Sequence, residues 1–586
     1  MTTKMPHKDV VIVGFGWTGA IMAEQLTNEG LDVLALERGL WRDTSTDYAV
    51  TNAQDEVRYR YRDELFEALS RETLTFRNRS DQTALPMRML GSFLPGTGVG
   101  GSGVHWNGQT WRFLPSDFQA RSHNIERYGA DAIPEDMTIQ DWGITYDELE
   151  PHYDTFEKIC GISGKAGNLN GEIREGGNPF EGPRSSESPN PPMSMVKAPM
   201  VFADAARELG YSPFPGPSAN MSQGYTNPLG VQLAPCTYCG FCEKFACGNY
   251  SKATANTTIL PVLMRRKNFT LRTGSMVLRV VHEGGQAKGV EYVNEEGEVF
   301  YQSADIVILA AYITHNVHLM LHSRIGQPYD PSTGEGVVGK NYAYQIVSGV
   351  KVFYDDLAVN PFVGAGALGQ VIDEFNGDNF DHSGLGFIGG GYIAQWQTNG
   401  RPIESHAVPE GTPKFGLGWK QAVRDSYNHT IGVGTHGAVM SYRSNYLDLD
   451  PDYSDAYGRP LMRMTFDYKD NDIRMSRYIT ERATEIARAM GGREIRVGQA
   501  RVPYDIAPYQ STHNTGGTIM GDTPRNSVLN KYQQSWDLPN LFLMGAGAFP
   551  QNPGYNPTGT VAALAYHSAQ AIREQYLRNP GPMVQA

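Results

Sequence analysis

Cysteine is scarce in this sequence of 586 residues, which contains five. Five cysteines in so long a chain do not make a disulfide framework. Long apolar runs are missing too, because the most apolar segments, VVIVGFG and ADIVILAAY, have the length of single strands. A bilayer-spanning helix needs roughly 20 apolar residues. We therefore expect neither a disulfide scaffold nor a membrane-spanning helix.

Clusters of basic residues are also missing, and the formal net charge is −13. Nucleic-acid binding depends on clustered Lys and Arg that displace counterions, so we expect no nucleic-acid partner. No basic block indicates a membrane-surface patch either. The first residues, MTTKMPHK, lead into a strand without a signal-peptide pattern, which alone favours the cytoplasm. At this length, two closely packed domains are the default expectation.

The first segment that carries chemistry is DVVIVGFGWTGAIMAEQLTNEGLDVLALERG. It predicts a strand over 10–13, a helix over 18–28 and a second strand over 32–36. Its glycines in G-x-G-x-x-G spacing are Gly14, Gly16 and Gly19. They allow, in that order, a tight turn, close approach of a pyrophosphate, and tight packing of helix on strand. Glu37 follows the second strand and would accept a ribose hydroxyl, so we predict a Rossmann-like dinucleotide-binding domain.

A second glycine-rich segment, LPGTGVGGSGVHWNGQTWR, favours FAD over NAD as the dinucleotide. An NAD domain has no evident use for such a loop, whereas a flavin needs main chain close to its pyrophosphate and ring. The alternative is a surface loop of glycines. The residues of this segment that we predict to bind FAD are Gly100, Gly101, Ser102, His105, Asn107 and Gly108.

Two later segments return to the nucleotide domain. The first is a hairpin-rich meander that ends in an apolar strand over 306–311, and the second has a strand over 541–544 followed by a helix over 558–576. Because the pieces are scattered along the chain, a second domain must be inserted between them. The residues of the last segment that we predict to contact the cofactor are Gly545, Ala546 and Thr558.

The candidate catalytic residues flank this last helix. Its N-terminus carries a partial positive charge, which would stabilise negative charge on a flavin ring. Asn556 stands just before the helix, and His513 lies upstream in STHNTGGTIMG. Histidine is the side chain best suited to accept an alcohol proton near neutral pH. A purely structural role is the alternative for one histidine among 14.

Four of the five cysteines lie in one window, PCTYCGFCEKFACGNYSKATANTT, and are Cys236, Cys239, Cys242 and Cys247. Their C-x2-C-x2-C-x4-C spacing is close to the C-x2-C-x2-C-x3-C of bacterial ferredoxins. Structural zinc sites use tetrahedral ligand sets that usually come as two separated pairs, so one short loop favours an iron–sulfur cluster. Zinc and unliganded thiols stay open as alternatives. The fifth cysteine, Cys160, is expected to be a buried apolar residue.

The N-terminal fingerprint, GVGGSGVHWNG, HNTGGTIMG and NPTGTVAALA together resemble the glucose–methanol–choline (GMC) oxidoreductase family over nearly the whole chain. The resemblance implies an α/β fold with a GMC-type, Rossmann-like FAD-binding domain and an inserted α+β substrate domain on an antiparallel sheet. It also implies that His513 and Asn556 face the flavin as the catalytic pair. The segments GFIGGGYIAQW and HGAVMSYRSNYLDLD are expected to be strands of the sheet that covers the pocket.

The expected domains follow from the same resemblance. They are an FAD-binding domain of residues 1–125, 230–345 and 500–586 with the iron–sulfur loop at 232–258, a lid or subunit-contact excursion at 126–229, and a substrate-binding domain at 346–499.

Within the family, the cysteine window most resembles multi-subunit dehydrogenases that oxidise sugar acids or sugars. This implies oxidation of a secondary alcohol, with D-gluconate to 2-dehydro-D-gluconate as the favoured reaction. It implies a [3Fe–4S] cluster on three of the four cysteines, which passes electrons to a cytochrome c subunit and quinone. It further implies a small subunit exported by the twin-arginine route, so that the chain works at the periplasmic face of the inner membrane and meets the membrane through its partner. A cytoplasmic enzyme is the alternative.

The alternative activity within the family is oxidation of neutral sugars or glucosides, as in the pyranose oxidases, which use oxygen and work alone. The segment VHW resembles the THW that anchors flavin in those oxidases, which implies a covalent bond between His105 and FAD. The alternative is an uncommitted histidine near the flavin. Arg443 and Lys420 are basic candidates for holding a substrate carboxylate.

Overall fold

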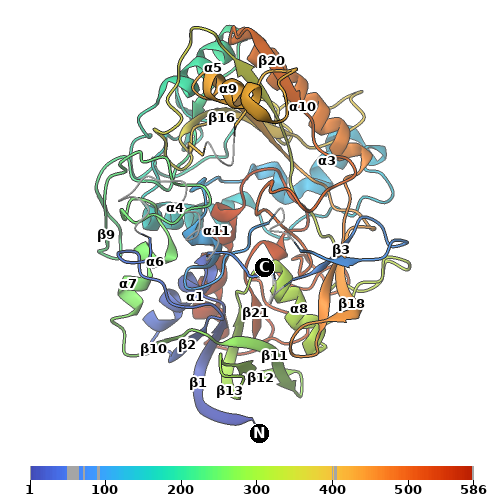
Figure 1. Ribbon diagram of the computed structural model, residues 1–586. Helices are drawn as coiled ribbons and strands as arrows, with labels where there is room; N and C mark the ends of the chain where they lie inside the picture. Colours follow the sequence, from blue (N-terminus) through green and yellow to red (C-terminus); the bar gives the residue numbers. More distant parts are fainter. Residues whose placement is uncertain are drawn as a thin grey trace.

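A computed structural model describes residues 2–48, 65–69, 73–88, 93–398, 400–401 and 406–583. Figure 1 shows a sheet near the N-terminus and, at the opposite end of the molecule, a second sheet covered by helices. Within the described residues, no helix combines the length and the apolar character that crossing a membrane requires.

The first sheet has seven strands in the order β10-β2-β1-β13-β12-β11, with β21 paired to β13. Its parallel strands are β1 (Thr3–Val13), β2 (Val33–Leu36), β10 (Phe269–Arg272), β13 (Val299–Leu309) and β21 (Leu541–Leu543). The antiparallel strands are β11 (Met276–Glu283) and β12 (Gln286–Val293). The predicted βαβ unit and the meander are confirmed. The strand predicted over 10–13 is the buried end of β1, whose first half is too polar and exposed to show an apolar run.

Two helices direct their N-termini toward the carboxyl ends of these strands. Helix α1 (Trp17–Asn28) begins after Gly16, and α11 (Thr558–Ala571) begins after Pro557. Neither helix has a side chain that caps its first turn. The helix predicted over 558–576 is confirmed, with the difference that its last turn, Ile572–Tyr576, is a π-helix. Helices α1 and α11 pack against each other, and α4 (Tyr146–Cys160) packs on α11.

The second sheet is antiparallel, with six strands in the order β20-β14-β17-β16-β15-β7. Their bounds are β20 (Glu494–Gly498), β14 (Ile346–Phe353), β17 (Thr430–Gly437), β16 (Gly391–Trp396), β15 (Gly369–Ile372) and β7 (Phe214–Pro215). Helix α10 (Asp470–Ala489) packs on this sheet beside α5 (Lys197–Glu208) (Figure 1). The predicted α+β domain on an antiparallel sheet is confirmed.

The prediction that HGAVMSYRSNYLDLD belongs to this sheet is wrong for most of the segment. Strand β17 ends at Gly437, and Val439 then forms an isolated bridge with Asn552 outside the sheet. Strand β18 (Tyr446–Ser454) belongs instead to a four-stranded sheet in the order β18-β19-β3-β4. Its other strands are β19 (Pro460–Thr465), β3 (Thr75–Arg77) and β4 (Leu85–Pro86).

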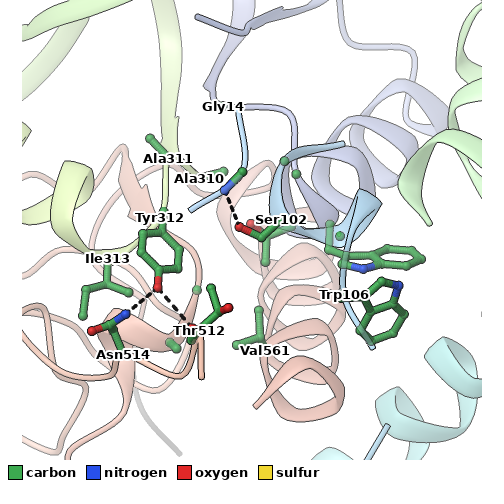
Figure 2. Close-up of a pocket in the computed structure, with 18 of the residues that line it drawn as sticks. Gly14, Ser102, Trp106, Ala310, Ala311, Tyr312, Ile313, Thr512, Asn514 and Val561 are labelled. Carbon is green, nitrogen blue, oxygen red and sulfur yellow. Dashed lines mark hydrogen bonds between the residues drawn. The ribbon is translucent and has the colours of Figure 1, made fainter. Parts of the chain in front are cut away.

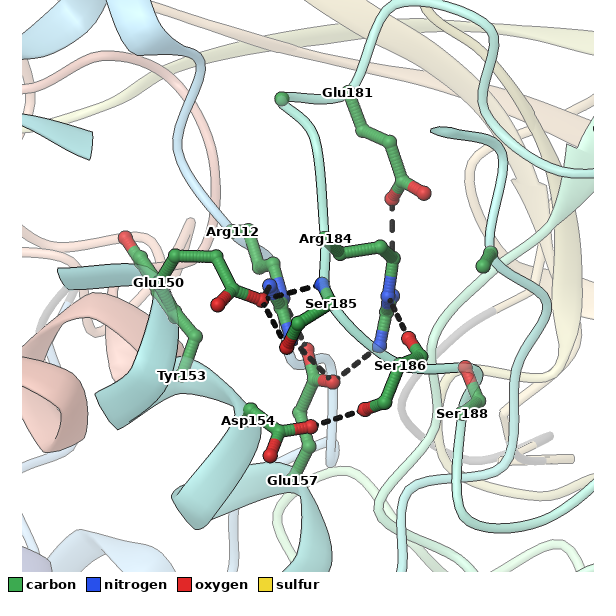
Figure 3. A network of polar contacts seen from close by, with 12 residues as sticks. Arg112, Glu150, Tyr153, Asp154, Glu157, Glu181, Arg184, Ser185, Ser186 and Ser188 are labelled. Carbon is green, nitrogen blue, oxygen red and sulfur yellow. Dashed lines mark hydrogen bonds and ion pairs between the residues drawn. The ribbon is translucent and has the colours of Figure 1, made fainter. Parts of the chain in front are cut away.

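The remaining elements are mostly short connections. They are α3 (Ala120–Tyr128), α6 (Ala255–Thr258), α7 (Leu260–Leu263), α8 (Ile313–Ser323), α9 (Gly416–Tyr427), β5 (Asn168–Leu169), β6 (Glu172–Ile173), β8 (Tyr225–Thr226) and β9 (Gln232–Leu233). The segment 126–229 supplies α4, which packs on α11, and β7, which extends the second sheet. Within a buried network, Glu157 of α4 binds both Arg112, which precedes the segment, and Arg184, which lies in the loop after α4 (Figure 3). The domain boundaries stay predictions.

Candidate active site

A cavity of about 370 Å³ lies where both glycine-rich segments meet the N-termini of α1 and α11 (Figure 2). Both candidate catalytic residues, His513 and Asn556, line it. The predicted cofactor-binding residues that line it are Gly14, Gly16, Glu37, Gly101, Ser102, His105, Asn107, Gly108, Gly545, Ala546 and Thr558. Gly19 and Gly100 are the two that do not.

These two glycines lie behind the cavity wall and allow its main-chain segments to pack closely. A Cβ on Gly19 would lie 2.2 Å from the carbonyl oxygen of Gly14, so only glycine lets α1 pack this closely on the turn. Gly100 has a φ of +97°, and its N–H donates to the carbonyl of Phe15 at 2.7 Å. The two glycine segments are thereby joined. The uncapped first turn of α1 is left facing the cavity, which is the usual setting for a phosphate.

Glu37 is placed to bind a ribose. The residue is 6% exposed, and its carboxylate accepts hydrogen bonds from the N–H groups of Phe15 and Gly39, both at 2.9 Å. Burial raises the pKa of this carboxyl, and the bonds from the main chain oppose that effect. A carboxylate has about four acceptor positions, so capacity is left for ribose hydroxyls.

Three further features of the cavity fit FAD. A Cβ built on Gly545 would have no heavy atom within 4 Å, so open space lies beside this turn. The indole N–H of Trp17 and Nδ1 of His105 are buried and have no hydrogen-bond partner among the described residues. Both side chains line the cavity. Open space next to glycine main chain, with unused polar atoms around it, is what a dinucleotide would fill.

Gln345 fixes the tautomers of two histidines at the opposite wall. Its side-chain oxygen lies 2.5 Å from Nδ1 of His513 and 3.0 Å from Nδ1 of His436. Its side-chain nitrogen donates to the carbonyl of Gly554, so the oxygen must be the atom that faces the histidines. Both Nδ1 atoms therefore carry the proton, and Nε2 of His513 is left as a lone-pair acceptor.

Asn556 faces that acceptor. Its Nδ2 lies 3.2 Å from Nε2 of His513, while its Oδ1 accepts from the hydroxyl of Tyr392 at 2.9 Å and the indole N–H of Trp111 at 3.2 Å. The hydroxyl of Tyr392 and the indole nitrogen of Trp111 also lie 3.1 Å from Oε1 of Gln109, so each hydrogen is shared between two acceptors. The amide is thus held with its N–H toward His513. An alcohol oxygen placed between the two could give its proton to Nε2 and accept a hydrogen bond from Asn556.

Burial keeps this base neutral. Desolvation, with a smaller contribution from the neighbouring His436, lowers the pKa of His513 to about 3. Desolvation likewise lowers the pKa of His436 to about 4. A histidine that is unprotonated at every physiological pH is ready to accept a proton, although it is a weak base in the resting enzyme.

A pH profile tests this arrangement. Because protonation abolishes the acceptor and the pKa is lowered from its usual value of about 6.5, we expect a flat rate of flavin bleaching by substrate between about pH 5 and pH 8. The rate should fall only as the pH approaches the lowered pKa. Anaerobic stopped-flow absorbance across a buffer series measures it. A step in the rate near pH 6.5 would show that His513 keeps its ordinary pKa.

Several residues of the site were not predicted from the sequence. Gln109 and Trp111 lie in the second glycine-rich segment, directly after the predicted cofactor-binding residues Asn107 and Gly108. Tyr392 on β16 and His436 on β17 are register partners whose rings stack at 4.9 Å, and no spacing in the sequence relates them. The proposed carboxylate holders Arg443 and Lys420 do not line the cavity. Lys420 is exposed on α9, and Arg443 lies beside Gly334 instead.

The cysteine loop forms an outer wall of the cavity. The N–H of Lys244 donates to the carbonyl of His105 at 2.9 Å, and Nζ of Lys252 donates to the carbonyl of Trp106 at 2.8 Å. Glu243, between two of the cysteines, lines the cavity itself. The side-chain N–H of Asn220 lies 3.4 Å from Sγ of Cys242 and 3.6 Å from Sγ of Cys236. The window is therefore close to the predicted flavin segment.

The parallel sheet, the glycine turns and the His–Asn pair define a Rossmann-type flavin-dependent oxidoreductase. Family models described as GMC oxidoreductase match residues 198–347 and 441–565. The chain is 51% identical, over its full length and 97% of the relative, to the gluconate 2-dehydrogenase flavoprotein of Pantoea cypripedii. The chain belongs to the GMC oxidoreductase family, as its motifs predicted. It is an FAD-dependent enzyme that oxidises CH–OH donors.

More distant relatives align with nearly the whole chain. The fructose dehydrogenase large subunit of Gluconobacter japonicus is 26% identical over 98% of this chain and 99% of its own. The 2-methyl-1,2-propanediol dehydrogenase of Mycolicibacterium austroafricanum is 26% identical over 98% and 97%. The crystal structure of pyridoxine 4-oxidase from Mesorbium loti superposes with a TM-score of 0.58 at 17% identity, covering 97% of this chain and all of that one. That likeness supports the fold.

Proposed function

We propose that this enzyme oxidises a secondary alcohol of a sugar acid, with D-gluconate to 2-dehydro-D-gluconate as the favoured reaction. The observation that carries the proposal is the neutral His513 Nε2 set 3.2 Å from Asn556 Nδ2 in the cavity of a chain 51% identical to a gluconate 2-dehydrogenase flavoprotein. His513 would take the hydroxyl proton, and Asn556 would hold the same oxygen. FAD, when bound, supplies the acceptor for the hydride from the substrate carbon.

A substrate panel tests the proposal. The purified enzyme should reduce an artificial acceptor fastest with D-gluconate, and slower with D-glucose, D-fructose, a glucoside or a polyol. The fructose dehydrogenase relative keeps oxidation of a neutral sugar as the second candidate. Faster turnover with a neutral sugar than with any sugar acid would favour that candidate. Rapid oxygen consumption without an added acceptor would favour a pyranose-oxidase-like enzyme.

The cysteine window is proposed to hold an iron–sulfur cluster, which by the resemblance is a [3Fe–4S] cluster on three of its four cysteines. In the described part of the chain, one group of three potential metal ligands has its ligand atoms within 4.8 Å of one another, and it consists of His7, Asp9 and Asp305. No three cysteine sulfurs lie that close together. Tetrahedral zinc with bonds of 2.3 Å sets sulfurs about 3.8 Å apart. The sulfurs are therefore not set for tetrahedral zinc, and N–H donors to the sulfurs, such as Asn220, are typical of cluster ligands.

The partners are proposed on the same resemblance. A cytochrome c subunit would accept electrons from the cluster and pass them to quinone, and a small twin-arginine-exported subunit would carry the folded chain to the periplasmic face of the inner membrane. The printed name of the fructose dehydrogenase relative, a large subunit, fits a multi-subunit enzyme. Fractionation of cells that express the chain with and without its small-subunit gene tests the location. Activity that remains in the cytoplasm of both kinds of cells would support the cytoplasmic alternative.

His105 is proposed to bond covalently to the flavin. Its Nε2 lies 3.1 Å from the carbonyl of Leu94, and its buried Nδ1 lacks a hydrogen-bond partner among the described residues. Burial lowers its pKa to about 3, so the ring is neutral and can act as a nucleophile. We expect acid precipitation to carry the yellow chromophore into the pellet, and His105→Ala to release it. Complete release of flavin from the unaltered enzyme would exclude the bond.

A further inference from the structure

Lys252 is a fully buried lysine, 0% exposed, behind the cysteine loop. Its Nζ donates to three main-chain carbonyls, those of Trp106 at 2.8 Å, Phe245 at 2.8 Å and Cys242 at 3.0 Å. Three carbonyl acceptors require three N–H donors. A neutral amine has two, and its lone pair would point at the third oxygen. The geometry therefore requires the charged ammonium form.

This ammonium has no carboxylate partner. Its hydrogen-bond partners are main-chain carbonyls, and one of them belongs to Cys242 in the cysteine window itself. No Asp or Glu of the described residues forms an ion pair with it, whereas the buried Lys531 has Glu148 at 3.0 Å. A buried charge without a counter-charge is strongly destabilising, so something negative must lie beside Lys252 in the working enzyme.

We infer that Lys252 is the counter-charge of an anionic metal–sulfur cluster in the cysteine window and raises the reduction potential of that cluster. The inference rests on the cluster proposed above. Thiolate ligands make such a cluster negative, and reduction adds a further negative charge. A fixed ammonium nearby stabilises the reduced form more than the oxidised form, because Coulomb attraction grows with the charge. Acceptance of electrons from the flavin side is thereby favoured.

The same ammonium is a positioning group. It binds Trp106 in the cavity wall with one N–H, and Cys242 and Phe245 in the cysteine loop with the other two. Together with the bond from Lys244 N–H to the carbonyl of His105, it fixes the loop against the flavin segment. Lys252 thus sets both the charge around the cluster and its placement relative to the flavin.

The test compares Lys252→Gln, which removes the charge and keeps two N–H donors, with Lys252→Arg, which keeps the charge. Iron content and an electron paramagnetic resonance redox titration of the purified holoenzyme give the cluster potential directly. We expect Lys252→Gln to shift the potential to more negative values and Lys252→Arg to stay near the unaltered enzyme. Lys531→Met removes another buried lysine charge, outside the cysteine loop, and should leave the potential unchanged.

Each remaining outcome decides the question. Loss of iron from Lys252→Gln but not from Lys252→Arg would also support the counter-charge, since Arg keeps the positive charge that Gln lacks. An unaltered potential in Lys252→Gln with full iron would overturn it. Loss of iron or of folded protein from both variants would assign Lys252 to packing and overturn it as well. Absence of iron from the unaltered enzyme would refute the proposed cluster itself, before any variant is made.

Discussion

His513→Ala is expected to slow flavin bleaching by D-gluconate by ~10²–10⁴-fold, the usual effect of removing a general base. Nε2 of His513 is the acceptor that Gln345 and Asn556 hold in place, at 2.5 Å and 3.2 Å from the two ring nitrogens. Without it, the hydroxyl proton has no base at the reacting oxygen. Anaerobic stopped-flow absorbance measures the rate, with flavin content checked in every preparation.

Two variants sharpen this test. Gln345→Leu keeps Nε2 but frees the ring to adopt the wrong tautomer, so we expect a smaller loss than in His513→Ala. His152→Ala removes another histidine whose pKa is lowered by burial, to about 4, and which does not line the cavity, so it should bleach at the unaltered rate. Near-normal bleaching in His513→Ala with flavin bound would show that another group takes the proton.

Cys242→Ser is expected to abolish turnover with the natural acceptor while substrate still bleaches the flavin rapidly. Cys242 is 3% exposed and close to the hydrogen-bond donor Asn220. On the proposed function, hydride transfer would take place in the cavity without the cluster, whereas emptying the flavin one electron at a time would need it. Small dyes that reach the flavin directly should still be reduced. Stopped-flow bleaching, dye-linked turnover and cytochrome-linked turnover are compared on one preparation.

A zinc site predicts a different pattern. Loss of a structural metal would loosen the loop, and all activities would fall together. Cys160→Ala is the matched control, because Cys160 is buried, lies outside the window and should leave the iron content unchanged. Equal loss of dye-linked and cytochrome-linked activity in Cys242→Ser, at unchanged iron content, would contradict the relay.

The nucleotide end of the molecule could be predicted from the sequence because its information is local. Gly14, Gly16 and Gly19 are needed within one turn, and Glu37 follows the very next strand. Because each glycine is required by the backbone at one place in the turn, the three recur at a fixed spacing in the sequence. The cysteine loop is local in the same sense. The proposed charge partner Lys252 could not be predicted, because a single lysine close to four cysteines carries no distinguishing pattern in a sequence.

The catalytic wall could not be predicted in full because tertiary pairing assembles it. Tyr392 and His436 meet through the register of β16 and β17, and Gln345 precedes β14, which lies on the other side of β17. Each residue alone is an unremarkable polar side chain in a strand. The misplaced β18 has the same origin, since an apolar pattern gives the strand but does not specify the sheet that it joins.

An anaerobic titration of the purified enzyme with D-gluconate, followed by visible absorbance, tests the central claim most directly. We predict that the unaltered protein shows flavin bands with a broad iron–sulfur shoulder. D-Gluconate should bleach the flavin bands first and then diminish the shoulder as electrons reach the cluster. A spectrum with flavin bands that D-gluconate leaves unchanged, while a neutral sugar bleaches them, would contradict the account.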